Sequence, residues 1–126
     1  MKNKTTYVDG FVLVIPKKKT GAYKKIAEEA AAVWTQCGAL RYRECLLDDA
    51  KPEHIVLTFP KLAQVKPSEA VWFSYIEFKS KKHRDSVNKK VMAYFNKKYT
   101  DAEMHTSMPF DMNRVSYGGF TVEVSA

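Results

Sequence analysis

The chain has 126 residues and a formal net charge of +7, with 45% hydrophobic and 13% aromatic residues. This length and composition fit one globular domain over residues 1–126, and the longest apolar run, residues 11–15, is far too short to cross a bilayer. The basic N-terminal stretch lacks the apolar core of a secretory signal, so we expect a soluble, cytoplasmic protein with no membrane partner. Only four of the 21 basic residues are arginines and the lysines are scattered. This favours a solvated lysine surface over a nucleic-acid site, with RNA as an alternative partner.

The first half of the chain predicts a strand followed by an amphipathic helix. Residues 7–15 are typical of a strand, which Pro16 closes. Thr20 is the expected N-cap of a helix over residues 20–37, and Gly38 is its expected C-terminal stop. The apolar residues of this helix fall on one stripe and most of its charged residues fall opposite, as in a helix that lies on a sheet. The stripe comprises Tyr23, Ile26, Ala27, Ala30, Val33, Trp34 and Cys37.

The rest of the chain predicts two strands, a second helix and a final strand. Residues 40–48 and 71–79 are typical of strands, and the segment between them is long enough to contain a short extra strand over residues 55–59. Ser80 is the expected cap of a helix that runs to about residue 98, and residues 114–124 predict the last strand.

The order strand, helix, strand, strand, helix, strand predicts the α+β, ferredoxin-like βαββαβ fold: one antiparallel sheet with two helices on one face. A water-exposed second face would alternate with polar residues, yet in the first strand Phe11 and Leu13 lie on one side and Val12 and Val14 on the other. Both faces are therefore apolar. A second copy packing sheet against sheet is the simplest cover, which predicts a homodimer with a shared barrel-like core.

Four stretches of the sequence, "YVDGFVLVIPKK", "CGALRYRECLLDD", "FSYIEFKSKKHRDSVNKKVM" and "MPFDMNRVSYGGF", resemble the bacterial domain-of-unknown-function family 1428. The resemblance covers nearly the whole chain, and Arg84, Asp85 and Asn88 fit the family's second helix. It implies membership of the dimeric α+β barrel superfamily, and hence the ferredoxin-like sheet and the homodimer. Relatives in that superfamily include cofactor-free monooxygenases, lactone isomerases and haem enzymes, so the resemblance implies a fold rather than a reaction.

Arg84 falls near the centre of the apolar face of the second helix. A guanidinium that points inward stays charged and needs an acidic partner. The candidate partners are Asp9, Glu44 and Asp111, of which we favour Asp111 and Glu44. Three interpretations stay open: a staple between a turn and the helix, a positive site for a small anionic or carbonyl-bearing ligand, or a solvent-facing arginine.

A cleft between the first helix and the sheet is a second candidate site. Ala27 and Ala30 leave room beside Trp34, and Ser74 and Tyr75 bring hydroxyl groups into an apolar strand. These residues predict an apolar ligand pocket with a few polar groups. The alternative is that the alanines only let the helix approach the sheet closely.

The stretch "MPFDMNRVSYGGF" predicts a turn before the last strand. Phe110 is expected to anchor the turn in the core, and Asp111 to accept hydrogen bonds from nearby arginines or backbone amides. Arg114 is a further ligand-binding candidate. Gly118 and Gly119 allow a bulge or a close approach of backbone or ligand to the sheet.

The titratable residues predict neither a metal site nor a cofactor. His83 is the candidate general base nearest Arg84 but is better explained as a partly exposed side chain, and His54 and His105 lack partners at ligand spacing. Cys37 and Cys45 do not match a disulfide framework or a zinc motif. Because P-loop, nucleophile-elbow and dinucleotide patterns are also lacking, we expect a binder of a small organic ligand or a cofactor-free enzyme. The alternatives are a polyanion-binding (RNA) module and a structural or regulatory dimer.

Overall fold

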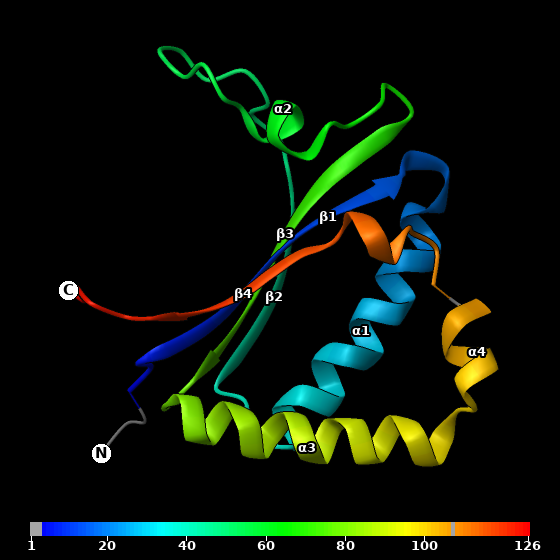
Figure 1. Cartoon of the computed structure of the whole chain (residues 1–126), viewed down its shortest axis with the longest axis vertical. Helices are drawn as coiled ribbons and strands as arrows, with labels where there is room; N and C mark the ends of the chain where they lie inside the picture. Colours follow the sequence, from blue (N-terminus) through cyan, green and yellow to red (C-terminus); the bar gives the residue numbers. More distant parts are fainter. Residues whose placement is uncertain (1–3, 107) are drawn as a thin grey trace.

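The computed structural model describes residues 4–106 and 108–126, in which four strands form one antiparallel sheet in the order β2-β3-β1-β4 (Figure 1). Counted from the other edge, the order is β4-β1-β3-β2, with β1 and β3 at the centre. This order confirms the predicted α+β, ferredoxin-like arrangement. The strands are β1 (Tyr7–Pro16), β2 (Arg41–Leu46), β3 (Glu69–Phe78) and β4 (Ser116–Thr121).

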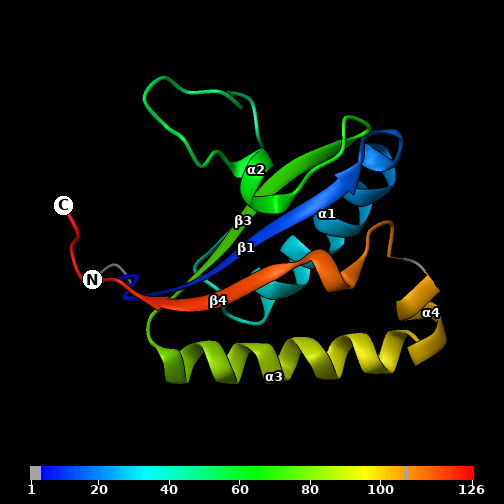
Figure 2. The ribbon, with the colours of Figure 1, turned by 45° about the horizontal axis from the view of Figure 1, so that its top comes forward.

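Two long helices, α1 (Thr20–Gln36) and α3 (Lys81–Lys98), lie together on one side of the sheet (Figures 1 and 2). The short helix α2 (Phe59–Ala63) contacts β1 and β3 from the other side, and α4 (Asp101–Thr106) follows α3. Two 3-10 turns, Lys17–Lys19 and Met112–Arg114, precede α1 and β4. No helix in the described part of the chain is both long enough and apolar enough to cross a membrane.

The ends of the two long helices test the predicted caps. Ser80 caps α3 as predicted, because its Oγ accepts a hydrogen bond from the His83 amide at 3.0 Å. Gly38 follows α1 with a φ of +118°, a conformation that favours glycine. The prediction for Thr20 is wrong: it lies inside α1, and its hydroxyl donates to the Lys17 carbonyl at 2.7 Å. The preceding 3-10 turn supplies that carbonyl.

The predicted strand over residues 55–59 is also wrong, because this region is a loop that leads into α2. Thr58 caps α2, and Pro60 occupies its first turn, where a missing amide hydrogen costs nothing. In a strand, the same proline would remove a ladder hydrogen bond. The helix packs over one end of the sheet, where Val14 and Val71 are buried.

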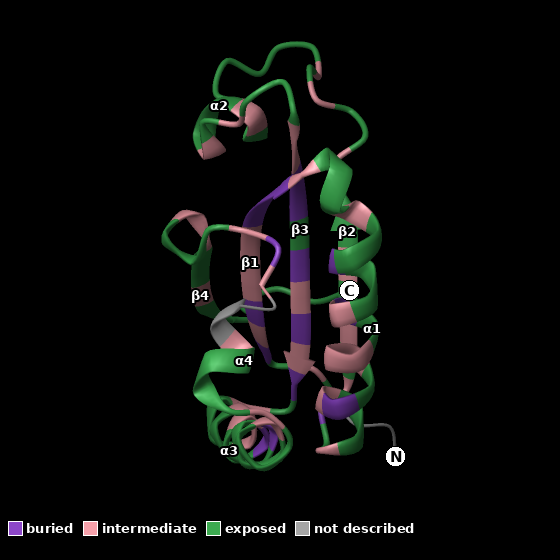
Figure 3. Ribbon diagram, turned by 90° about the vertical axis from the view of Figure 1, so that its right-hand side faces the viewer, coloured by how far each residue is buried: buried purple, intermediate pink, exposed green. Residues whose placement is uncertain are grey.

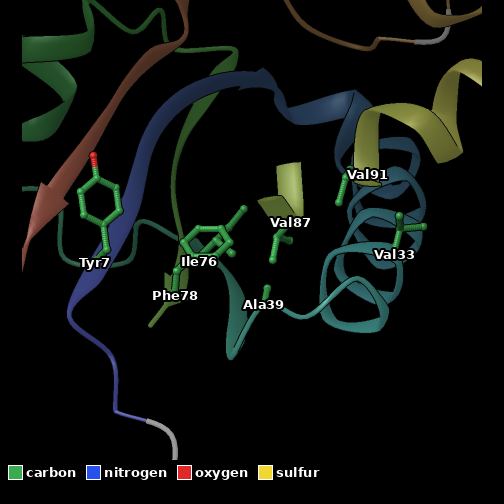
Figure 4. Close-up of a cluster of buried hydrophobic side chains, with 7 residues drawn as sticks. All are labelled: Tyr7, Val33, Ala39, Ile76, Phe78, Val87 and Val91. Carbon is green, nitrogen blue, oxygen red and sulfur yellow. The ribbon is translucent and has the colours of Figure 1, made fainter. Parts of the chain in front are cut away.

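Buried side chains follow the central strands β1 and β3 (Figure 3). On the helix side they join the core that α1 and α3 cover, as the cluster in Figure 4 shows. Its members are Tyr7, Val33, Ala39, Ile76, Phe78, Val87 and Val91. On the opposite, open face, Phe73 of β3 is 43% exposed and Phe120 of β4 is 61% exposed. The open face thus keeps the apolar character predicted for it.

The paired glycines of β4 make room for an aromatic ring. Gly118 and Gly119 pair with Gly10 and Asp9 in continuous register, so the predicted alternative of a bulge does not apply. A Cβ on Gly119 would overlap the hydroxyl group of Tyr7. The glycine therefore lets the Tyr7 ring lie across β4, where the Arg84 guanidinium sits 5.1 Å from the ring centroid.

Candidate ligand-binding site

A cavity of about 180 Å³ lies between α1 and the helix-facing side of the sheet. Its volume resembles that of cavities of about 150 Å³ that hold a benzene ring. Most of its lining is apolar or aromatic, and its polar groups are one carboxylate, one serine hydroxyl and tyrosine hydroxyls. The lining residues are Phe11, Leu13, Tyr23, Ile26, Ala27, Ala30, Trp34, Tyr42, Glu44, Ser74, Ile76, Met108 and Phe110.

Helical and strand periodicity place these residues around one space. Ala27, Ala30 and Trp34 follow at spacings of three and four on the same face of α1, and the two alanines leave the space open. Tyr42 and Glu44 are two apart in β2 and so share a face of the sheet. Their cross-strand neighbours on β3 include Ser74, which pairs with Glu44.

Glu44 is the acidic group of the cavity, and two tyrosines hold it. The Tyr23 hydroxyl donates to Oε1 at 2.8 Å, and the Tyr42 hydroxyl donates to Oε2 at 2.6 Å. Burial raises the pKa of Glu44, more than the two hydrogen bonds lower it. Burial and the neighbouring carboxylate raise the pKa of both phenols, which stay neutral donors. Among the side chains that the structure describes, no cation forms an ion pair with Glu44.

Aromatic rings form the walls around this carboxylate. The Trp34 ring lies 6.0 Å from that of Tyr42, and Phe110 meets Tyr23 edge-on at 5.7 Å. The Trp34 Nε1 donates to the Asn88 side chain at 3.0 Å, which fixes the indole orientation. Phe110 therefore anchors the turn in the core, as predicted, and at the same time closes one side of the cavity.

Arg84 pairs with Asp9, not with the favoured acids Asp111 and Glu44. Its Nη1 donates to Asp9 Oδ1 at 2.8 Å and to the Tyr117 hydroxyl at 2.5 Å. The Asp9 side chain is 2% exposed and that of Arg84 is 13% exposed, so the pair is largely out of water. The predicted pairing is wrong because Asp9 faces the helices from the central strand, directly under α3.

The Arg84 cluster is a staple between α3 and β1. Burial raises the pKa of Asp9, against the opposing influence of Arg84 and of hydrogen bonds from Tyr117 and Asn88. Arg84 also bonds Asp85 through its Nε at 2.8 Å. Its charge is thus neutralised away from the cavity, and Asn88, which accepts the Trp34 indole N–H, lies near enough to Asp9 to influence its pKa.

Three other predicted site residues lie away from the cavity. Tyr75 sits on the open face, beside Phe73. Asp111 caps the turn before β4 by accepting the Asn113 amide at 2.9 Å. Arg114 donates two hydrogen bonds to Glu69, at 2.7 and 3.1 Å. The structure therefore gathers Trp34, Glu44 and Ser74 of the seven candidates in one cavity and places Arg84, Asp111, Tyr75 and Arg114 elsewhere.

Sequence reasoning missed Tyr42 as part of the site, although a signal existed. Tyr42 precedes Glu44 by two residues in a strand, a spacing that puts both side chains on one face. Met108 carries no such signal, because it lies in the irregular segment after α4. Among the described residues, no group of three or more histidine, cysteine or acidic side chains could hold a metal ion.

Three other hollows also contain a carboxylate: in two of them it has a cationic partner, and in the third, of about 330 Å³, Asp48 is exposed to solvent. A hollow of about 240 Å³ lies across Trp34, between α1, α3 and α4, and its Glu29 bonds Lys98 at 2.5 Å. A wider hollow of about 640 Å³ between β3 and the α2 region contains Glu69, which Arg114 holds. Glu44 differs from Glu29 and Glu69 in lacking a described cationic partner, and from Asp48 in being partly buried.

Comparison with known proteins identifies the family. Residues 6–112, a span that contains every residue lining the cavity, match the family described as protein of unknown function (DUF1428). The chain is 42% identical over 114 residues to the uncharacterized protein YbaA of Escherichia coli K12, covering 90% of this chain and 93% of the relative. YbaA of Shigella flexneri matches with the same identity and coverage. The chain therefore belongs to the DUF1428 family.

Proposed function

We propose that this protein binds a small, largely apolar organic molecule in the cavity beneath α1. The observation that carries the proposal is the Glu44 carboxylate, which lies without a described cationic partner in an otherwise apolar, aromatic-walled space. Ligand pockets combine an apolar lining with a small number of placed polar groups. Acids that line a cleft and have a displaced pKa, as the partly buried Glu44 does, gather at functional sites.

The same carboxyl group is suited to proton transfer. Because burial raises the pKa of Glu44, its protonated and ionised forms lie closer in energy at neutral pH than those of an exposed glutamate. Tyr23 and Tyr42 hold the carboxylate in one orientation. A cofactor-free proton transfer to or from the bound molecule is the chemistry that this arrangement supports best.

Filling the cavity tests the proposal. Ala30→Leu projects a larger side chain into the space, so affinity for any cavity ligand should fall about tenfold or more. The matched control is Ala32→Leu, the same change at an exposed position of α1. Calorimetric titration of both variants with single-ring amines, alcohols, phenols and carboxylates measures the effect.

Two results would contradict the proposal. One is binding that Ala30→Leu leaves intact while circular dichroism shows both variants folded. The other is silence of the whole small-molecule panel together with salt-sensitive binding of a short RNA, which would support the polyanion alternative.

We also propose that two copies associate through the open face of the sheet. Phe73 and Phe120 are 43% and 61% exposed on this face. Val56, in the loop before α2, is a further exposed apolar side chain, at 83%. Apolar surface of this extent favours burial against a partner, and a two-fold dimer buries the same face of both copies.

A charge on the open face should separate the copies. Phe73→Asp would place a carboxylate in the centre of the proposed interface, and we expect a monomer where the wild type sediments as a dimer. Met112→Asp, at a residue 58% exposed in the turn before β4, is the control and should leave the dimer intact. A monomeric wild type in sedimentation equilibrium at about 100 μM would contradict the proposal.

A further inference from the structure

We infer that the ligand of the cavity beneath α1 is an organic amine, bound as its ammonium ion against Glu44. The inference rests on the proposed function and names its ligand class. It starts from a contrast between carboxylates. Asp9, Glu29 and Glu69 each bond an arginine or a lysine, whereas the described partners of Glu44 are two neutral phenols.

The hydrogen bonds around Glu44 specify a donor. A carboxylate has about four acceptor positions on its two oxygens. Tyr23 and Tyr42 each use one position, on different oxygens of Glu44. Each oxygen therefore keeps a free acceptor position for a ligand. An ammonium group brings the donors and the positive charge that would complete this site. A carboxylate ligand would meet a like charge, and a purely apolar one would leave the partly buried charge of Glu44 without compensation.

The walls of the cavity fit the same cation. Five aromatic side chains line the space around Glu44, and the faces of such rings attract ammonium groups. The buried Ser74, across the strands from Glu44, adds a polar group at the same level. The aromatic lining residues are Phe11, Tyr23, Trp34, Tyr42 and Phe110.

The size of the cavity indicates which part of the molecule it can hold. Its volume of about 180 Å³ admits a single ring with a short aminoalkyl arm, since a benzene ring occupies cavities of about 150 Å³. The chain as a whole carries a net charge of +7, which repels an ammonium ion. Selection of the ammonium ion is therefore local, through Glu44 and the rings.

Three probes of nearly equal size and different charge test the inference in the unaltered protein: benzylamine, benzyl alcohol and benzoate. Calorimetric titration near neutral pH should give about tenfold or greater preference for benzylamine over benzyl alcohol, with benzoate the weakest. Glu44→Gln should abolish this preference. Glu29→Gln, which removes a carboxylate already paired with Lys98, should preserve it.

The outcomes separate the inference from the proposed function. If benzyl alcohol or benzoate binds as well as benzylamine, and Ala30→Leu blocks that binding, the cavity is a ligand site and the amine inference is overturned. If none of the three probes binds, the amine inference and the proposed function are both overturned for single-ring molecules of this size. The probe comparison in the wild type requires no variant, so a folding defect in Glu44→Gln would not obscure the result.

Discussion

Replacing Arg84 by methionine should destabilise the protein by about 3 to 5 kcal/mol, the range for removing one partner of a buried ion pair. The substitution leaves Asp9, whose side chain is 2% exposed, with an uncompensated charge. It also removes the bond from α3 to Tyr117 and the bond that Arg84 makes to its neighbour Asp85 within α3. Urea denaturation at fixed protein concentration measures the loss, because a dimer would make stability depend on concentration.

Two further variants show whether the buried pair is the cause. Asp9→Asn combined with Arg84→Met removes both charges and should recover most of the loss, because the introduced amide would keep hydrogen-bond partners in Tyr117 and Asn88. Lys98→Met breaks a more exposed pair, with side chains 47% and 31% exposed, and should change stability little. A double variant as unstable as the sum of its single changes would contradict this explanation.

Glu44→Gln should have the opposite effect and stabilise the ligand-free protein at pH values above the folded pKa of Glu44. Burial disfavours the ionised carboxylate, so the folded state has a Glu44 pKa above its ordinary value of 4.5. At pH values between the ordinary pKa and the higher folded-state pKa, the folded state binds more protons than the unfolded state. The free energy of unfolding therefore falls as the pH rises through this range. A neutral glutamine avoids this cost while it keeps an acceptor for Tyr23 or Tyr42.

The sign of the pH dependence is the measurement. The advantage of Glu44→Gln should be largest above the folded pKa of Glu44 and should disappear below about pH 4. Glu29→Gln should behave in reverse, because Lys98 and Tyr99 lower the pKa of Glu29. Because the pair with Lys98 is exposed, that variant should lose only a little stability at neutral pH, and the loss should fade in acid. A Glu44→Gln variant less stable than wild type at every pH would show that Glu44 is a structural clamp between the tyrosines.

The fold could be predicted because side-chain periodicity records which face of an element is buried. The apolar runs over residues 7–15 and 71–79 predicted the two central strands, and the stripe on α1 predicted which face of that helix lies on the sheet. Short elements escaped prediction for the same reason. Neither α2 nor α4 has more than six residues, too few to establish a period.

The site was predictable only where the same rule applied. Ser74 and Tyr75 are neighbours in a strand, so their side chains point to opposite faces and only one could reach the cavity. The ion-pair partner of Arg84 was harder to predict from the sequence. It depends on how α3 crosses the sheet, and the spacing of residues along the chain carries no information on that crossing. Asp9, Glu44 and Asp111 were all plausible partners by composition, and only the tertiary arrangement selects Asp9.

The central place of β1 has a consequence for the order in which the protein can assemble. This first strand pairs with β3 and with β4, so Tyr7 has Phe78 on one side and Thr121 on the other. During synthesis, β1 can pair with both β3 and β4 only after β4, near residue 121, has been made. Contacts between such distant segments slow folding and prolong the exposure of unpaired strand edges. The first strand of the sheet is thus the last to gain both of its neighbours.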